Sequence, residues 1–175
     1  MARQTNWFVI TGAPCSGKTS VISEIESRGI RVIHEVARSY IDQQLSQGLR
    51  LAQIKADILK FERHILHEKI KIEASLPKSE IIFFDRGVPD SIAYFELEGL
   101  DAQEPIRYSL KTRYQRIFFF EALDFLVDDV RSENEKIAVK LNKLLRKAYL
   151  LSGYDIDIIP VMPVQNRADK VLEII

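Results

Sequence analysis

The chain has 175 residues, of which 46% are hydrophobic and 29% charged, so it can bury one full core and is too short to divide convincingly into two domains. Its 25 basic and 25 acidic residues balance, which gives no electrostatic reason to expect nucleic acid or an anionic membrane as partner. The sequence has no apolar run long enough for a membrane span or a signal peptide, and its one cysteine excludes an internal disulfide framework. We therefore expect one soluble, cytoplasmic domain over residues 1–175.

The first predicted elements are a buried strand at 7–11, a loop at 12–19 and a helix at 19–26. The loop fits the pattern G-x-x-x-x-G-K-[ST]. In such a loop the backbone N–H groups converge on phosphate oxygens, and the following helix N-terminus favours negative charge. The pattern predicts nucleotide binding by Gly12, Ala13, Pro14, Cys15, Ser16, Gly17, Lys18 and Thr19.

Two side chains of this loop have specific expected roles. Lys18 should reach the β- and γ-phosphates, and the hydroxyl of Thr19 should complete the coordination of Mg²⁺. Cys15 lies inside the loop, so we expect a thiol reagent to block binding, although a small polarisable filler is its favoured role.

A second strand is predicted at 30–34 and a helix at 36–45. Glu35 and Arg38 lie three residues apart at the start of this helix and can share a face. They follow the carboxyl end of a strand, where open α/β sheets place their ligands. The alternatives are a surface ion pair, or a glutamate that stabilises the helix dipole. His34 is expected to be structural.

The apolar pattern over residues 51–76 predicts one long scaffolding helix, which ends at 77–79. Its two histidines, His64 and His67, are expected at the surface or its boundary, because no third metal ligand lies near them in the sequence.

Residues 80–85 are almost wholly apolar and predict a central strand buried on both faces. This strand ends at Asp85, which can hold Mg²⁺ directly or through water; the alternative is that it caps the next turn. Arg86 follows and can address phosphate oxygens with two N–H groups. A turn at 87–91 then leads to a helix at 92–96.

The segment 99–113 is mixed, with a boundary expected at Pro105 and a substrate rim expected at Arg107, Lys111 and Arg113. The remaining predicted elements are a strand at 116–120, a helix at 133–152, a strand at 155–160 and a helix at 167–175. Residues 124–133, whose charged side chains are acidic apart from Arg131, predict either a lid over the nucleotide or a solvated connection.

Five strands that alternate with helices predict a parallel sheet covered on both faces. The third strand, which carries the acid, should lie beside the first. This arrangement would bring Lys18, Thr19, Asp85 and Glu35 to one edge of the sheet, as phosphoryl transfer requires.

With these residues in place, the sequence resembles the small-kinase kind of P-loop NTPase. More narrowly, it resembles the AAA-type ATPase domain family that includes the ribosylnicotinamide kinase domain of NadR. The resemblance covers nearly the whole chain and is carried by ITGAPCSGKTS at 10–20, VIHEVARSYI at 32–41, FFDRGVPDSIAYF at 83–95 and IIPVMPVQNRADKVL at 158–172.

The resemblance implies a three-layer αβα sandwich whose five-stranded parallel sheet has the order 2-3-1-4-5. It implies that Ser20 joins Gly12, Gly17, Lys18 and Thr19 in the nucleotide loop, and that Asp85 is the metal-associated acid. In similar kinases the positions of Glu35, Arg38 and Arg86 face the phosphoryl acceptor, so Glu35 or Asp85 could orient or deprotonate an acceptor hydroxyl. The loop 163–167 is where related kinases hold the base.

Two positions depart from the family pattern. Cys15 stands where relatives often carry glycine, and the predicted lid has Arg131 alone where adjacent arginines are common. The second departure weakens the expectation that the lid stabilises the transition state, a contribution worth about 10³-fold or more in rate.

The leading hypothesis is an ATP- and Mg²⁺-dependent kinase of a small nucleoside-like molecule. Lys18 and Arg86 would then act on the phosphates, Thr19 and Asp85 on the metal, and Glu35 at the acceptor. The alternative is a regulatory ATPase or nucleotide-dependent switch that acts through a protein partner. A binding protein without turnover is disfavoured, because both metal positions are filled. The lack of an N-K-x-D pattern favours ATP over GTP only mildly, and the acceptor and oligomeric state stay open.

Overall fold

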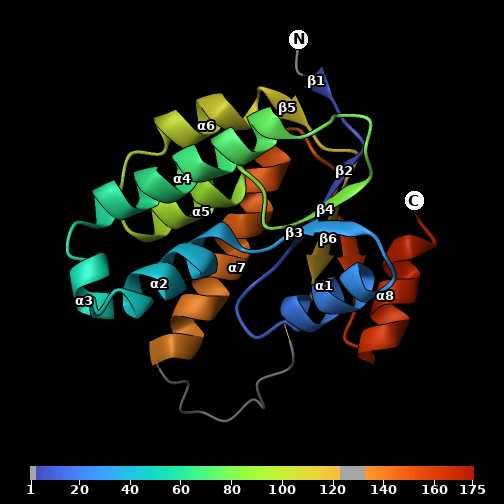
Figure 1. The fold of residues 1–175 in the computed structure, drawn as a ribbon, viewed down its shortest axis with the longest axis horizontal. Coiled ribbons are helices and arrows are strands. Elements are labelled where there is room, and N and C mark those ends of the chain that lie inside the picture. The colour runs from blue at the N-terminus through green and yellow to red at the C-terminus, as the bar shows by residue number, and fades with distance from the viewer. Residues whose placement is uncertain (1–2, 123–132) are drawn as a thin grey trace.

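The computed structural model describes residues 3–122 and 133–175 (Figure 1). Within these residues, a five-stranded parallel sheet has the order β3-β4-β2-β6-β7. Counted along the chain, this is the order 2-3-1-4-5, so the predicted topology is confirmed, with the acid-bearing strand beside the first. The strands are β2 (Trp7–Thr11), β3 (Arg31–Ile33), β4 (Ile82–Asp85), β6 (Arg116–Phe120) and β7 (Asp157–Ile159).

Helices cover both faces of this sheet and complete the three layers. On one side α1 (Lys18–Ser27) packs beside α8 (Val164–Leu172), at the right of Figure 1. On the other side, at the left, the described part of the chain places α2 (Val36–Ser46), α3 (Leu51–Ile54), α4 (Ile58–Ser75), α5 (Asp90–Leu97), α6 (Gln103–Ser109) and α7 (Glu133–Leu151).

The central strand β2 is apolar at successive positions because both of its faces are buried. Phe8 and Ile10 belong to the core cluster that includes Ile22 of α1 and Val171 of α8. Trp7 and Val9 point to the opposite face and belong to the cluster that includes Tyr149 of α7. A strand covered on both faces has no reason to alternate with polar residues, which is why the apolar run identifies it.

The single helix predicted over residues 51–76 is wrong. The chain forms α3 and α4 instead, separated by Lys55, Ala56 and Asp57. Oδ1 of Asp57 accepts a hydrogen bond from the backbone N–H of Lys60 at 2.9 Å, so this residue caps the N-terminus of a new helix. α4 buries an apolar face that includes Phe61, Ile65 and Leu66, whereas α3 has no buried residue.

One further expectation fails. Pro105 sets no boundary, because it lies in the first turn of α6, where a missing N–H group costs no intrahelical hydrogen bond. The structure also contains two short strands that were not predicted: β1 (Arg3–Gln4) pairs in parallel with β5 (Thr112–Arg113) in a separate two-stranded sheet. The other predicted elements are present; the strands at 7–11 and 116–120 agree at both ends, and no end of the others is shifted by more than three residues.

The predicted lid at 124–133, with Arg131, lies outside the described residues except for Glu133, where α7 begins. No helix within the described ranges is both long and apolar enough to cross a membrane.

Candidate active site

The phosphate loop connects β2 to α1 and depends on glycine at two positions. Gly12 has a φ of 141°, and a Cβ atom built on it would lie 2.5 Å from the carbonyl oxygen of Phe120. Gly17 has a φ of 81° and directly precedes α1. Both positions therefore require a residue without a side chain. The loop residue Cys15 also has a positive φ, 60°, and its side chain is exposed.

Lys18 lies folded into this loop. Its Nζ donates hydrogen bonds to the carbonyl oxygen of Ala13 at 2.8 Å and to Oγ of Ser16 at 3.2 Å. Burial, followed by the nearby charge of Arg86, lowers the pKa of Lys18 to about 8. The amine is thus a cation in a poorly hydrated site, where phosphate oxygens would be strong partners. Thr19 and Ser20 follow in the first turn of α1 with exposed side chains.

Asp85 ends β4 beside the central strand, where it pairs in register with Ile10. Its Oδ1 is buried and accepts no hydrogen bond from the residues that the structure describes. Burial, and then the neighbouring carboxylate of Glu35, raise the pKa of Asp85 to about 6. A buried carboxylate oxygen without a partner is costly, and a cation would relieve that cost. Asp85 and Thr19 therefore fit a Mg²⁺ site, with oxygen donors as that ion prefers.

Arg86 follows Asp85 with a φ of 70° and turns its side chain into the protein. Nε donates to Oε1 of Glu35 at 3.1 Å, and Nη1 donates to the carbonyl oxygen of Gly12 and to Oδ1 of Asp90, both at 3.2 Å. The guanidinium also lies over the ring of Tyr94, 5.4 Å from its centroid. Among residues 3–122 and 133–175, no hydrogen bond uses Nη2 of Arg86.

The structure gives Glu35 a different partner from the one its spacing indicated. Glu35 is half-buried and paired with Arg86, so the surface-pair interpretation with Arg38 is wrong. Arg38 is exposed and forms no ion pair with the described residues. His34 is also exposed and lies beside Glu26.

Asp90 is a buried connection that sequence reasoning missed. It accepts hydrogen bonds from Oγ1 of Thr11 at 2.6 Å, from the N–H of Gly87 at 2.9 Å and from the hydroxyl of Tyr149. Together with its contact to Arg86, these bonds fix the segment after β4 against the central strand. The sequence placed Asp90 in the turn before a helix, which gave no indication of these buried contacts.

Three charged side chains of α4 are buried, and one of them contacts the segment that follows β4. Nζ of Lys69 donates to the carbonyl oxygen of Gly87 at 3.0 Å and to Oγ of Ser91 at 3.3 Å. Glu73 accepts a hydrogen bond from the hydroxyl of Tyr114. Glu62 is buried on this face as well, and burial raises its pKa to about 7. In the sequence, these three residues recur at the helical spacing of the buried apolar residues of α4, and that spacing could have identified them as buried.

Arg167 of α8 also contacts the phosphate loop, at Ser16. Its guanidinium donates to the carbonyl oxygens of Ser16, of Pro160 at 2.7 Å and of Glu121 at 3.3 Å, and lies over the ring of Phe120. Only 2% of the residue is exposed. The resemblance pointed to this loop for the base, but nothing in the sequence indicated that its arginine binds the phosphate loop.

The expected substrate rim is wrong at Arg113. Arg113 belongs to β5, which precedes β6 and therefore lies at the amino end of the sheet, opposite Lys18 and Asp85. It donates to the carbonyl oxygens of Ser152 and Gly153. Arg107 and Lys111 lie over the ring of Tyr108, at α6 and the turn after it.

The chain resembles known proteins in sequence pattern and in fold. The family model described as an AAA domain matches residues 7–167. No curated protein matches in sequence.

Three solved structures have a similar fold. Deoxyadenosine kinase from M. mycoides is 16% identical over 95% of this chain and 96% of its own, with a TM-score of 0.63. Thymidylate kinase from Ehrlichia chaffeensis is 14% identical over 98% of both chains, with a TM-score of 0.64. The NadR protein, solved with NR, is 17% identical over 98% of this chain but only 51% of NadR, with a TM-score of 0.68.

Proposed function

This chain belongs to the AAA domain family, and we propose that it is an ATP- and Mg²⁺-dependent phosphotransferase that acts on a small nucleoside-like molecule. One observation carries the proposal. A buried lysine, a buried carboxylate with an unpartnered oxygen, and the Glu35–Arg86 pair meet at the carboxyl edge of one parallel sheet. Phosphoryl transfer needs this combination, because its catalysis consists mainly of positioning and charge neutralisation.

Each side chain has a proposed role in that reaction. Mg-ATP, when bound, supplies the phosphoryl group and the charge that the loop neutralises. Lys18 would exchange its contacts with Ala13 and Ser16 for phosphate oxygens, and Thr19 and Asp85 would hold the metal.

The acceptor side of the site would depend on the Glu35–Arg86 pair. Oε2 of Glu35 accepts no hydrogen bond from the described residues and could receive the proton of an acceptor hydroxyl. Nη2 of Arg86 would address a phosphate. Arg38 would contribute at the acceptor opening, where its exposed side chain is free to move.

The similar structures support a small acceptor. Two of them are described as a deoxyadenosine kinase and a thymidylate kinase, and the third was solved with NR bound. We therefore propose a nucleoside or nucleotide acceptor, and we expect the side of the sheet occupied by α2, α4 and α5 to receive it, because Glu35 directly precedes α2 and Arg86 lies between β4 and α5.

The test is the rate of ADP release with Mg-ATP, alone and with a panel of nucleosides and nucleoside monophosphates that includes nicotinamide riboside. Strong stimulation by one compound, lost in Lys18→Ala and retained in the exposed control Lys71→Ala, would support the proposal. A slow rate that stays unchanged across the panel would contradict it and favour the regulatory ATPase.

A further inference from the structure

The peptide group between Gly87 and Val88, which follows Arg86, is held at both of its ends. Nζ of Lys69 donates a hydrogen bond to the carbonyl oxygen of Gly87 at 3.0 Å, and the N–H of Val88 donates to the hydroxyl of Tyr114 at 3.0 Å. We infer that Lys69 and Tyr114 are positioning residues, which act on phosphoryl transfer by holding Arg86 in place. Their expected effect on turnover rests on the proposed function, whereas their hold on the arginine does not.

Arg86 needs such support because its backbone conformation is unfavourable. Its φ of 70° lies in the left-handed region, which residues other than glycine rarely adopt. A residue keeps such a conformation only where its surroundings enforce it. In this conformation the guanidinium reaches Glu35 and the carbonyl oxygen of Gly12. Loss of the contacts on the next peptide group would therefore let the arginine leave the phosphate loop.

Stability alone does not explain a lysine at position 69. The residue is only 6% exposed, burial lowers the pKa of its amine, and the described residues offer it two uncharged oxygens rather than an ion pair. Where a charge is buried, an apolar side chain of similar volume is often as stable or more stable. What Lys69 adds is a pair of hydrogen bonds, to the carbonyl oxygen of Gly87 and to Oγ of Ser91 at 3.3 Å. Its amine therefore serves the geometry of this turn.

The ring of Tyr114 lies so close to Gly87 that the turn has no room for a side chain there. A Cβ atom built on Gly87 would lie 2.9 Å from the hydroxyl oxygen of Tyr114. Gly87 does not have a positive φ, so space rather than backbone freedom requires glycine. The same hydroxyl donates to the buried carboxylate of Glu73, which orients it to accept from the N–H of Val88. Tyr114 thus holds the turn by contact and by hydrogen bond.

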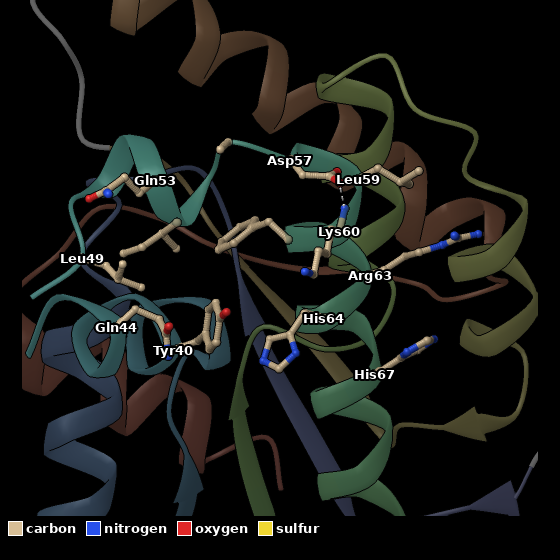
Figure 2. Close-up of a pocket in the computed structure, with 13 residues that line it drawn as sticks. Tyr40, Gln44, Leu49, Gln53, Asp57, Leu59, Lys60, Arg63, His64 and His67 are labelled. Atoms are coloured by element: carbon tan, nitrogen blue, oxygen red, sulfur yellow. Dashed lines mark hydrogen bonds between the residues drawn. The ribbon is translucent and has the colours of Figure 1, made fainter. Parts of the chain in front are cut away.

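The part of α4 that holds the turn is separate from the part that faces the acceptor side. As far as His67, the helix lines a cavity of about 770 Å³ with α2 and α3, on the side of the sheet where we expect the acceptor (Figure 2). Lys69 and Glu73 lie further along the helix, and neither lines this cavity. A substitution at Lys69 therefore changes the support of Arg86 while it keeps the side chains of the cavity wall.

The hold on Arg86 is tested without turnover, by the rate at which phenylglyoxal modifies its guanidinium in the full chain, measured by mass spectrometry. The Arg86 side chain is 4% exposed, so the wild type should react slowly there. Lys69→Met keeps the length of the side chain but removes the amine, and we expect it to speed the modification of Arg86 about fivefold or more. Arg167, which is also buried, is the internal control and should react at the wild-type rate. Equal acceleration at both arginines would indicate a general loosening and overturn the proposal.

Tyr114→Phe is the second variant, because it keeps the ring against Gly87 and removes only the hydroxyl. We expect faster modification of Arg86 in this variant too. Lys71→Met, at an exposed position of the same helix, is the matched control and should react as the wild type does. Unchanged modification of Arg86 in a folded Lys69→Met, or in Tyr114→Phe if the former does not fold, would overturn the proposal.

Turnover supplies an independent measurement through a double-mutant cycle. Lys69→Met should lower kcat about tenfold or more and leave the KM for ATP within about twofold, because the phosphate loop keeps its own residues. In an Arg86→Ala background, the same substitution should lower kcat no further, since a residue that acts through the arginine has nothing left to position. Fully additive losses would overturn the proposal. If the wild type phosphorylates no acceptor, the proposed function fails, and the modification rates still decide whether Lys69 and Tyr114 hold Arg86.

Discussion

Oε1 of Glu35 accepts a hydrogen bond from Nε of Arg86 at 3.1 Å, and this contact joins the ends of two adjacent strands, β3 and β4. The Arg86 side chain is 4% exposed and that of Glu35 is 23% exposed, so the pair extends from the interior to an opening. The buried arginine also reaches the carbonyl oxygen of Gly12. The pair thus connects the phosphate loop with the side of the site where an acceptor would enter.

Glu35→Gln should separate binding from transfer. Glutamine keeps the oxygen that faces Arg86 but cannot take up a proton at neutral pH, so we expect turnover to fall about 10²- to 10⁴-fold and nucleotide affinity to stay within about twofold. Single-turnover rates and calorimetry measure the two quantities. Glu26→Gln, at an exposed residue beside His34, is the matched control. Equal losses of affinity and rate in Glu35→Gln would show that the residue only supports the fold.

Asp85→Asn should stabilise the protein at neutral and higher pH. The pKa of Asp85 is raised from 3.8 to about 6, so its carboxylate costs stability as the pH rises from 3.8 through 6. Removal of the charge should raise the free energy of unfolding by up to about 3 kcal/mol at pH 8, and by little at pH 4. Urea unfolding at the two pH values measures this, and the same gain at both would indicate a packing effect instead.

Affinity for Mg-ATP should depend on pH with a maximum between about 6 and about 8. Below pH 6 the carboxyl of Asp85 is protonated and loses its attraction for Mg²⁺, and above pH 8 Lys18 loses its charge, because its pKa is about 8. Calorimetry from pH 5 to 9 would trace both limbs. In Asp85→Asn the loss of affinity below pH 6 should be smaller. An equally steep loss in this variant would show that protonation of the nucleotide itself causes it.

Arg167 should act as a positioning residue for the phosphate loop. Arg167→Lys cannot reach three carbonyl oxygens at once, so we expect the KM for ATP to rise about tenfold and kcat to change less. Arg28→Lys is the matched control, because that arginine also contacts α8, through Asp169, but is partly exposed. A normal KM in Arg167→Lys would mean that the loop holds its shape without the guanidinium.

N-ethylmaleimide should block nucleotide binding through Cys15. The thiol is exposed in the phosphate loop, and an adduct there would fill the space of the phosphates. Cys15→Gly should bind nucleotide normally, resist the reagent and keep its stability within about 1 kcal/mol, since the φ of 60° suits glycine. Inhibition of the glycine variant by the same reagent would exclude the thiol as its target.

The sheet and the phosphate loop could be predicted from the sequence because their signals are local. A strand buried on both faces is an apolar run, as at 7–11 and 82–84, and alternation with helices fixes the parallel order. The break between α3 and α4 was missed because the helical period runs through Lys55 and Ala56, both good helix formers, and only the cap at Asp57 divides them.

The partners inside the site could not be predicted, because spacing reports only neighbours along the chain. Glu35 was compared with Arg38 three residues away, whereas its partner is Arg86, 51 residues away across the sheet. The prediction of Arg113 as part of a substrate rim failed for a different reason, because the sequence already contained the information against it. A segment just before a parallel strand lies at the amino end of the sheet, so the position of Arg113 before β6 already excluded it from the ligand edge.

The bond from Arg167 to the carbonyl oxygen of Ser16 spans 151 residues. During synthesis, the ribosome therefore makes the phosphate loop well before the side chain that fixes it. A nascent or C-terminally shortened chain would therefore have the nucleotide motif without its final geometry. Competence to bind nucleotide would therefore appear only after Arg167 has been synthesised and has reached the loop.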